Sequence, residues 1–452
     1  MRTGATTARH LVEESLARIA AHPDLNAVTA LRADEALAEA DAVDAAVARG
    51  DDPGPLAGLP VLAKDNDDVR GMRTTHGSRW FADAPAAESD GVTVGRLRAA
   101  GGIVVGKTNV PEFCIEGFTD NLVFGATRNP WNRDLSPGGS SGGSAAALAA
   151  GLSVIATGTD GGGSVRIPAA FCGLLGYKPT NGVIGRRTPP DWIDLSTDGL
   201  MATSADDLAL LLDVVAGPVH GDPTALPVPL PPARLPERLI VAERTDDLGP
   251  LPADVAAAFH ESAARLAELL GVPVEHREPG DLFPGFVPDE DWFVLATAEH
   301  ASVFGRERIE RDAHLLHPSA REFLLEGLAV SADDYLAARR RRFAAVARLD
   351  ALLGSTAALV TPTVPEPGWT PDGHRPGHPE GLLGAEAYST AIQNMTGLPA
   401  ISLPAGPLPD GMPFGLQVTM PRWADRALLE VAARWEAAFP WPRTAPAYRE
   451  LA

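Results

Sequence analysis

The chain has 452 residues, of which 45% are hydrophobic and 21% are charged, the balance of a globular protein that buries a sizeable core. Acidic residues outnumber basic ones by 59 to 38, for a formal net charge of −21. Phosphate binding needs clustered Lys and Arg, so this charge argues against nucleic acid as a partner. The two cysteines, Cys114 and Cys172, exclude a disulfide framework, and their spacing does not indicate a metal site.

No stretch of the sequence has the pattern of a targeting or membrane segment. Residues 1–7 lack the apolar core of a signal peptide. The longest apolar stretch of low charge, 145–157, is too short to span a bilayer. We therefore expect a cytoplasmic protein that makes no membrane contact.

Helical and strand patterns alternate through the first half of the chain. Thr7 is placed to cap a helix that runs to about Ala21, and a second amphipathic helix is predicted over residues 31–48. Apolar runs and helical patterns then predict strands at 59–63, 103–105 and 152–156, and helices at 92–99 and 144–150. This alternation predicts an α/β layered fold with a parallel or mixed sheet.

The second half opens with a proline-rich segment, residues 218–236, in which seven of nineteen residues are proline. We interpret it as a surface connector between two halves of one domain spanning residues 1–452, because so many prolines exclude regular structure. Later patterns predict a strand at 239–243, helices at 253–270 and 332–353, strands at 358–361, 400–403 and 414–420, and a terminal helix at 424–438. The basic run Arg339–Arg342 is predicted to be a solvated helix face.

One short motif formally matches a phosphate-binding loop. Residues 101–108 fit the pattern GxxxxGK[ST]. A phosphate loop requires a strand before its first glycine, whereas here Ile103–Val105 is itself the strand and a helical pattern precedes it. Pro111 also prevents a helix from starting cleanly at Lys107. We therefore reject nucleotide binding.

A second short motif, Gly138–Gly142, formally matches the GxSxG elbow of α/β-hydrolases. That elbow follows a hydrophobic strand, but Pro137 breaks any strand here. An acid and a histidine should follow it in the chain. The available His374 and His378 lie in a Pro/Gly-rich stretch that predicts an exposed loop. We therefore predict no Ser-His-Asp triad.

Two Gly/Ser clusters, residues 137–144 and 158–164, remain as candidates for chemistry. Glycines let backbone N–H groups converge on one point, as in an oxyanion hole, although a pair of tight turns has the same composition. The clusters and their flanks resemble the amidase signature family from the first helix to the last. The matching segments are GLPV at 58–61 with Lys64-Asp65, GKTN at 106–109 with PEF at 111–113, NPWN at 129–132, GGSSGGS at 138–144, GTDGGGSVRIPAAFCG at 158–173, GYKPT at 176–180 and GLPAI at 397–401. The resemblance implies a single large α/β domain whose central mixed sheet is covered by helices on both faces.

The resemblance also implies roles for three side chains. Ser164, which ends the second cluster, corresponds to the nucleophile of the family. Ser140, which follows a cis peptide bond in the family, corresponds to the bridging serine, and Lys64 corresponds to the base. The oxyanion-hole donors of the family map onto the backbone N–H groups of Gly161, Gly162, Gly163 and Ser164. The position of Gly161 often carries Thr or Ile in relatives, so we expect that side of the hole to be wider or looser here.

Elementary chemistry agrees with these roles. A serine hydroxyl is a weak nucleophile until a base removes its proton, and a lysine can be that base if burial keeps its amine neutral. Lys64 ends an apolar strand, which favours such burial, and Ser140 can pass the proton of Ser164 to it and back to the leaving amine. Asp160 and Arg166 flank the predicted nucleophile, and we interpret them as holding the glycine loop by an ion pair or by hydrogen bonds rather than as taking part in catalysis.

The expected function is hydrolysis of C–N acyl bonds through an acyl-enzyme on Ser164. Amides are the leading substrates, with anilides, esters and carbamates (urethanes) as further candidates. The alternative is the A subunit of a glutamyl-tRNA(Gln) amidotransferase, which shares the same core; a non-catalytic binding module is disfavoured by the intact triad. We expect a small-molecule partner, no metal or cofactor, and a homodimer as one option for assembly. Candidate pocket walls are 114–119, the aromatic-containing segment 283–304 (with Phe283, Phe286, Trp292, Phe293 and Phe304) and Gln393-Asn394.

Overall fold

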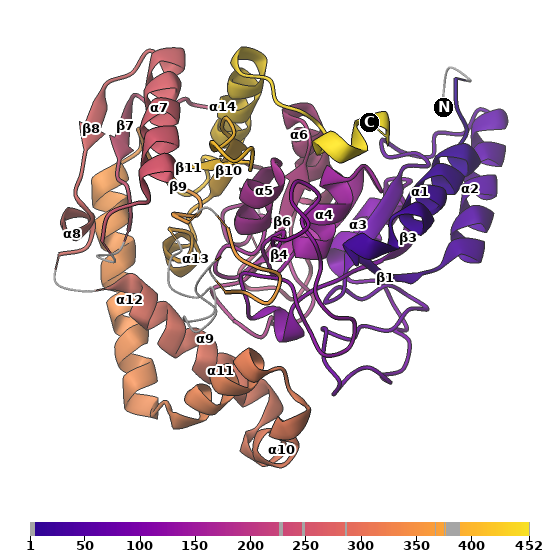
Figure 1. The fold of residues 1–452 in the computed structure, drawn as a ribbon, viewed down its shortest axis with the longest axis horizontal. Coiled ribbons are helices and arrows are strands. Elements are labelled where there is room, and N and C mark those ends of the chain that lie inside the picture. Colours follow the sequence, from indigo (N-terminus) through magenta and orange to yellow (C-terminus); the bar gives the residue numbers. More distant parts are fainter. Residues whose placement is uncertain are drawn as a thin grey trace.

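The computed structural model describes residues 5–225, 229–245, 249–284, 287–366, 368–374, 376 and 389–451. Its first half (Figure 1) contains α1 (Ala8–Ala21), β1 (Val28–Leu31), α2 (Ala33–Ala48), β2 (Pro60–Lys64), α3 (Val92–Ala99), β3 (Ile103–Thr108), α4 (Gly142–Ala149), β4 (Ile155–Asp160), α5 (Arg166–Cys172), β5 (Leu175–Lys178), β6 (Thr197–Ala202) and α6 (Ala205–Val215). The second half contains β7 (Arg238–Val241), α7 (Ala253–Leu270), β8 (Val274–His276), α8 (Pro279–Leu282), α9 (Pro288–Phe304), α10 (Arg306–Asp312), α11 (Pro318–Ala329), α12 (Ala332–Leu353), β9 (Ala357–Pro362), α13 (Ala391–Thr396), β10 (Ala400–Pro404), β11 (Gly415–Thr419) and α14 (Asp425–Ala438).

The strands of the described residues form one eleven-stranded sheet in the order β1-β3-β2-β4-β6-β5-β10-β11-β9-β7-β8. β2 runs parallel to β3 and β4, and β7 runs parallel to β8 and β9. The other neighbouring pairs are antiparallel. The predicted α/β class with one central mixed sheet is therefore confirmed.

Helices cover both faces of this sheet, which is why its central strands are apolar on both sides. Along β2, Val61 and Ala63 belong to one buried core, and the intervening Leu62 belongs to a second core. The first core also contains side chains of α3, α6, α7 and α14, and the second contains side chains of α1, α2, α4 and α5. Burial on both faces keeps water away from the strand ends that carry the site.

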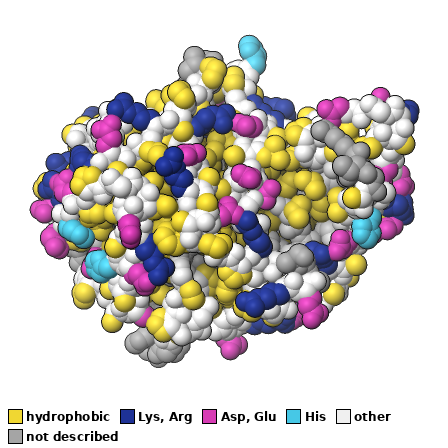
Figure 2. Space-filling model, turned by 90° about the horizontal axis from the view of Figure 1, so that it is seen from above, with side chains coloured by type: hydrophobic (Ala, Val, Ile, Leu, Met, Phe, Trp, Pro, Cys, Tyr) yellow, Lys and Arg dark blue, Asp and Glu magenta, His cyan; other side chains and the backbone are white. Residues whose placement is uncertain are grey.

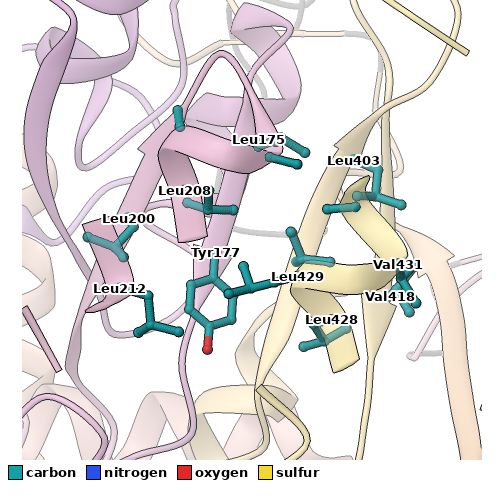
Figure 3. Close-up of a cluster of buried hydrophobic side chains, with 14 of the residues drawn as sticks. Leu175, Tyr177, Leu200, Leu208, Leu212, Leu403, Val418, Leu428, Leu429 and Val431 are labelled. Carbon is teal, nitrogen blue, oxygen red and sulfur yellow. The ribbon is translucent and has the colours of Figure 1, made fainter. Parts of the chain in front are cut away.

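The larger core lies where α6 and α14 meet on the sheet (Figure 3). Tyr177 of β5 is fully buried among the leucines and valines of these elements. Its hydroxyl donates to the buried carboxylate of Asp425 at the start of α14. Thr180 donates to the same carboxylate from its N–H at 2.8 Å and from its Oγ1 at 2.7 Å. This carboxylate therefore fixes α14 against β5.

Helices α9 to α12 extend beyond the sheet as a helical arm, in which α9 packs against α11 and α12 (Figure 1). Arg339 and Arg342 of α12 both contact Asp194, at 2.7 and 3.1 Å. Arg341 contacts Asp291 of α9 at 2.6 Å. The prediction of a solvated basic face is therefore wrong for Arg339 and Arg342, which are partly buried against Asp194, whereas Arg341 is paired but still exposed.

Several predicted elements agree closely with the structure. Thr7 Oγ1 accepts the His10 N–H at 3.1 Å and caps α1, as predicted. α3, α7 and α12 begin and end at the predicted residues. The helix predicted from residue 31 instead begins at Ala33, because Leu31 pairs with Gly106 as the last residue of β1. A four-residue strand beside a helix carries too little pattern to be separated from it.

The surface of the molecule carries charges of both signs. On the face shown in Figure 2, basic and acidic side chains are interspersed with hydrophobic ones. The described residues of 218–236 form no helix or strand, and most of them are exposed or half-buried. Throughout the part of the chain that the structure describes, no helix combines the length and the apolar character needed to cross a membrane.

Candidate active site

Lys64, the last residue of the buried strand β2, is itself fully buried. Its Nζ lies 2.7 Å from Ser140 Oγ and 2.7 Å from Thr159 Oγ1. Burial is the main cause that lowers the pKa of Lys64, because desolvation disfavours the charged ammonium. An amine in this position loses its proton more easily than an exposed lysine and can act as a base.

Ser140 stands in the loop that leads into α4, after a cis peptide bond between Gly139 and Ser140. A Cβ at Gly139 would lie 2.4 Å from the carbonyl oxygen of Phe118, so this close approach requires glycine. The N–H of the next residue, Ser141, donates to the carbonyl oxygen of Ser164 at 3.1 Å. The loop of the bridging serine is therefore attached to the loop of the predicted nucleophile.

Ser164 lies between β4 and α5, on the wall of a cavity of about 440 Å³ that Ser140, Cys114 and Thr159 also line. Its side chain is nearly buried, with the residue 8% exposed. Within the described residues no hydrogen bond holds its hydroxyl, so Oγ can rotate between Ser140 and a bound carbonyl. Ser140 and Ser164 thus line one cavity, and Lys64, buried behind it, is hydrogen-bonded to Ser140.

The glycine loop that precedes Ser164 is held by its carbonyl groups. Trp292 Nε1 donates to the carbonyl oxygen of Gly161 at 2.8 Å, and Thr390 Oγ1 donates to that of Gly162 at 2.6 Å. In a planar trans peptide the N–H points away from the carbonyl of the same unit, so these bonds also fix the N–H groups that follow. These two hydrogen bonds therefore hold the loop in one orientation.

One of the predicted oxyanion-hole donors is engaged elsewhere. The N–H of Gly163 donates to Asp160 Oδ1 at 2.9 Å, so it is not available to an oxyanion in this arrangement. Within the described residues, the remaining candidate donors have no protein acceptor; they are the N–H groups of Gly161, Gly162 and Ser164. The prediction therefore needs correction at Gly163, whose N–H orients the loop.

The expectation that Gly161 loosens the hole is wrong, because an indole ring fills the space that a side chain would take. A Cβ at Gly161 would lie 2.3 Å from Trp192 Cε3, and one at Gly162 would lie 2.6 Å from Trp292 Cζ2. The two indoles contact each other edge to face, with ring centroids 5.4 Å apart. The glycines therefore let two tryptophans press against the backbone of the loop.

A fully buried ion pair anchors the same loop. Arg166 Nη2 lies 2.7 Å from Asp160 Oδ1, and Arg166 Nε donates to Asp160 Oδ2 at 3.0 Å. Further N–H groups of Arg166 donate at 2.7–3.0 Å to the side-chain oxygens of Gln393, Asn394 and Gln417. Burial alone would raise the pKa of Asp160, but the charge and hydrogen bonds of Arg166, together with the Lys178 charge and a hydrogen bond from Asn394, outweigh burial and lower the pKa to about 2. The interpretation as a structural ion pair is confirmed.

Two threonines of β4 belong to the site, although sequence analysis did not single them out. Thr159 Oγ1 accepts from Lys64 Nζ, and Thr157 Oγ1 accepts the Lys64 backbone N–H at 2.8 Å. Thr157 also donates to Asp67, whose pKa rises to about 7 because of burial and the neighbouring Asp198 charge. Alternate residues of a strand share a face, so the Thr-Gly-Thr pattern was a signal that could have revealed both threonines.

The cavity walls differ from those expected. Cys114 lines the cavity, but of the described residues in 283–304 only His300 of α9 does. Gln393 and Asn394 bind Arg166 instead. Phe286 lies outside the described residues. The longest continuous part of the wall comes from the connection between β5 and β6, which no periodic pattern marks, and from the start of β6. The lining residues of the connection are Gly185, Arg186, Arg187, Thr188, Pro189, Pro190, Asp191, Trp192 and Ser196, and those of β6 are Thr197 and Asp198.

The two rejected motifs have other roles. Lys107 lies within β3, 1% exposed, and contacts Asp65 at 2.9 Å, so it is part of the core and does not face a phosphate. Ser140 follows a loop and not a strand. His374 is absent from the residues that line the cavity, and His378 lies outside the described residues.

Comparison with known proteins agrees with this geometry. The Amidase family model matches residues 10–429. The chain is 36% identical over 469 residues to the A subunit of the glutamyl-tRNA(Gln) amidotransferase of Synechococcus sp. (strain CC9902), covering 97% of this chain and 94% of that protein. Its fold is similar to that of a bacterial aryl acylamidase, with a TM-score of 0.87 and 26% identity over 100% of this chain and 96% of that one. It is also similar to 6-aminohexanoate cyclic dimer hydrolase, with a TM-score of 0.85 and 30% identity over 99% and 97% of the two chains. The chain therefore belongs to the amidase signature family.

Proposed function

We propose that the chain is a stand-alone amidase that hydrolyses C–N acyl bonds of small molecules through an acyl-enzyme on Ser164. The observation that carries this proposal is the fully buried amine of Lys64, which lies 2.7 Å from Ser140 Oγ. Ser140 in turn lines the same cavity as Ser164. Burial favours the neutral amine, so this chain has a base without a histidine.

In the proposed reaction Ser164 Oγ attacks the acyl carbon while its proton passes to Ser140 and the Ser140 proton passes to Lys64. The charge that develops on the acyl oxygen is stabilised by N–H groups of the glycine loop. The proton then returns through Ser140 to the leaving nitrogen, the C–N bond breaks and the amine departs. Water attacks the acyl-enzyme by the same relay, which releases the acid and restores Ser164.

We propose amides as the leading substrates, with anilides, esters and carbamates as further candidates. The similarity to an aryl acylamidase and to a cyclic amide hydrolase supports amide-type bonds. The same proposal makes the enzyme cytoplasmic and independent of any metal or cofactor, with a small molecule as its partner rather than a nucleic acid or a membrane. The excess of 59 acidic over 38 basic residues supports the exclusion of nucleic acid.

The alternative function is that of the A subunit in an amidotransferase, and the 36% identity to the Synechococcus protein favours it. Such a protein hydrolyses glutamine to supply ammonia and needs partner proteins to hold the tRNA. The purified chain distinguishes the two functions. A stand-alone amidase turns over primary amides, p-nitroanilides or carbamates by itself, and Ser164→Ala abolishes that turnover. Activity that is confined to glutamine and emerges only when partner proteins are added would support the alternative.

A further inference from the structure

Five aspartates line the catalytic cavity, and four of them already accept hydrogen bonds from the protein. Thr157 donates to Asp67, Thr74 to Asp68, Arg98 to Asp90 and Thr93 to Asp198. In the part of the chain that the structure describes, Asp191 alone among the five has no hydrogen-bond donor, and its side chain is 45% exposed. Asp191 is therefore the carboxylate that remains able to bind a ligand in the cavity.

A buried imidazole without partners faces the same cavity. His300 of α9 is 1% exposed and lines the cavity, and neither of its ring nitrogens has a hydrogen-bond partner. Its neighbours are aromatic: Phe113, Phe304, Phe323 and Trp192 all lie within ring-contact distance. Leaving buried polar atoms unpaired destabilises a fold, so we expect a bound ligand to form a hydrogen bond with the His300 ring.

His300 and Asp191 are close enough to share one ligand atom. His300 Nε2 lies 3.8 Å from Asp191 Oδ2, too far for a direct hydrogen bond, but a single nitrogen donor at about 2.9 Å from each atom spans this gap. Burial lowers the pKa of His300 to about 4, so at neutral pH the imidazole is uncharged and one of its nitrogens is an acceptor. A carboxylate and an acceptor nitrogen together suit a positively charged donor.

The pair also lies beside the reacting groups. Trp192, the residue after Asp191, packs its ring against Gly161 of the glycine loop. The two arginines of the same wall are engaged elsewhere: Arg186 donates to backbone carbonyls of residues 193 and 196, and Arg187 donates to the carbonyl oxygen of Asp90 at 3.4 Å. This wall therefore favours binding of a cationic ligand group over an anionic one.

We propose that Asp191 and His300 bind a protonated amino group of the substrate, so that the preferred amides carry an ammonium group on the acyl or the amine side of the scissile bond. This inference rests on the proposed amidase function, because it assumes that the cavity binds the amide. It narrows that function to one charge class of substrate.

The test compares amides that differ only in the ammonium group. The pairs are 5-aminopentanamide with pentanamide for the acyl side, and N-(4-aminobutyl)acetamide with N-butylacetamide for the amine side. For at least one pair, wild-type kcat/KM should be about tenfold higher for the cationic member, as expected for one partly exposed ion pair with a hydrogen bond. Asp191→Asn, which keeps the shape and removes the charge, should bring this ratio close to one.

Asp410→Asn is the matched control, because Asp410 is an exposed turn residue outside the cavity and, among the residues that the structure describes, its side chain accepts only from Met412 N–H. It should keep the wild-type ratio. His300→Phe places a ring without nitrogens among the aromatic neighbours. It should lower the ratio by raising KM for the cationic member, without lowering Tm. An unchanged ratio in Asp191→Asn or in His300→Phe overturns the role proposed for that residue.

Binding to the Ser164→Ala protein, measured by calorimetry, separates this inference from the proposed function. Tighter binding of 5-aminopentanamide than of pentanamide supports the inference even if the wild type hydrolyses neither amide, an outcome that would overturn only the amidase proposal. Equal binding of the two amides, or tightest binding of the anionic analogue 5-amino-5-oxopentanoate, would overturn the ammonium site while leaving amide hydrolysis intact.

Discussion

A lysine serves as a base only where its ammonium is destabilised, and Lys64 is in such a place. Its amine is buried at the end of β2, and its two short hydrogen bonds go to the hydroxyl groups of Ser140 and Thr159, with a longer one of 3.4 Å to the carbonyl oxygen of Thr159. Hydroxyl groups can accept from the ammonium and donate to the neutral amine, so both protonation states are accommodated. The residue can therefore take and return a proton without rearranging its surroundings.

The proton relay predicts a difference between amides and activated esters. An amine leaves only after it is protonated, whereas p-nitrophenolate leaves without a proton, so Lys64→Ala should lower kcat/KM for an amide about 10²–10⁴-fold and for a p-nitrophenyl ester much less. Ser140→Ala should show the same bias. Wild-type amide turnover should rise with pH as Lys64, whose pKa burial lowers, loses its proton. His374→Ala is the control and should keep its amide turnover. Loss of amide turnover in His374→Ala, with nearly wild-type amide turnover in Lys64→Ala, would exclude the relay.

The close packing of Trp192 on Gly161 leads to a second prediction, a loss of kcat in Gly161→Ala. Gly161→Ala places a Cβ 2.3 Å from the Trp192 ring, so the ring or the loop must move. A displacement of about 1 Å in the groups that contact the acyl oxygen can cost about 10²-fold in rate, and we expect kcat to fall by that order with little change in Tm. Gly406→Ala, at a glycine whose Cβ would meet nothing within 4 Å, should leave kcat unchanged. Full activity of Gly161→Ala would show that the indole does not set the loop.

At the scale of elements, long helices and short apolar strands such as β2, β10 and β11 were predictable, whereas polar strand ends were not. α7 and α12 have apolar periodicity over many residues, and their limits were predicted correctly. The strand predicted at 152–156 is instead β4, Ile155–Asp160, whose last four residues are Thr, Gly, Thr and Asp. A hydrophobic pattern could not reveal the C-terminal end of β4, because its side chains are polar. They are tolerated there because Lys64 hydrogen-bonds to both threonines and β6 pairs with the backbone.

The element that positions the nucleophile depends on the Asp160–Arg166 pair, which joins the end of β4 to the start of α5. Asp160→Asn leaves Arg166 buried without its counter-charge, which typically costs about 3–5 kcal/mol in unfolding free energy. We expect denaturant unfolding to report a loss of this size. Asp41→Asn, which breaks the exposed pair with Arg9, should change stability little. A small loss in Asp160→Asn would mean that the loop is anchored by its other hydrogen bonds.

At the scale of the whole molecule, the sequence identified the candidate catalytic side chains but not the cavity around them. Ser140, Ser164 and Lys64 lie in segments whose resemblance to the amidase signature family assigns them roles, whereas Asp191 and His300 come together only through tertiary packing. One belongs to an irregular connection and the other to a helix of the arm. Neither has a local pattern that differs from an ordinary surface or core residue, so the specificity wall could not be predicted.

The absence of a metal requirement is a further prediction for the whole protein. Within the described residues, no group of three or more His, Cys, Asp or Glu side chains could hold a metal ion. Dialysis against a chelator should therefore leave amide turnover unchanged. A loss of activity that added zinc or manganese restores would place the protein in a different mechanistic class.

The role of Ser164 as the nucleophile is central to the proposed function, and covalent labelling tests it most directly. A fluorophosphonate probe should react with the wild-type protein, and peptide mass spectrometry should locate a single adduct on Ser164. Lys64→Ala should label more slowly, because the base that activates Ser164 is missing. An adduct on Ser141 or on any other residue, or undiminished labelling of Ser164→Ala, would contradict this role.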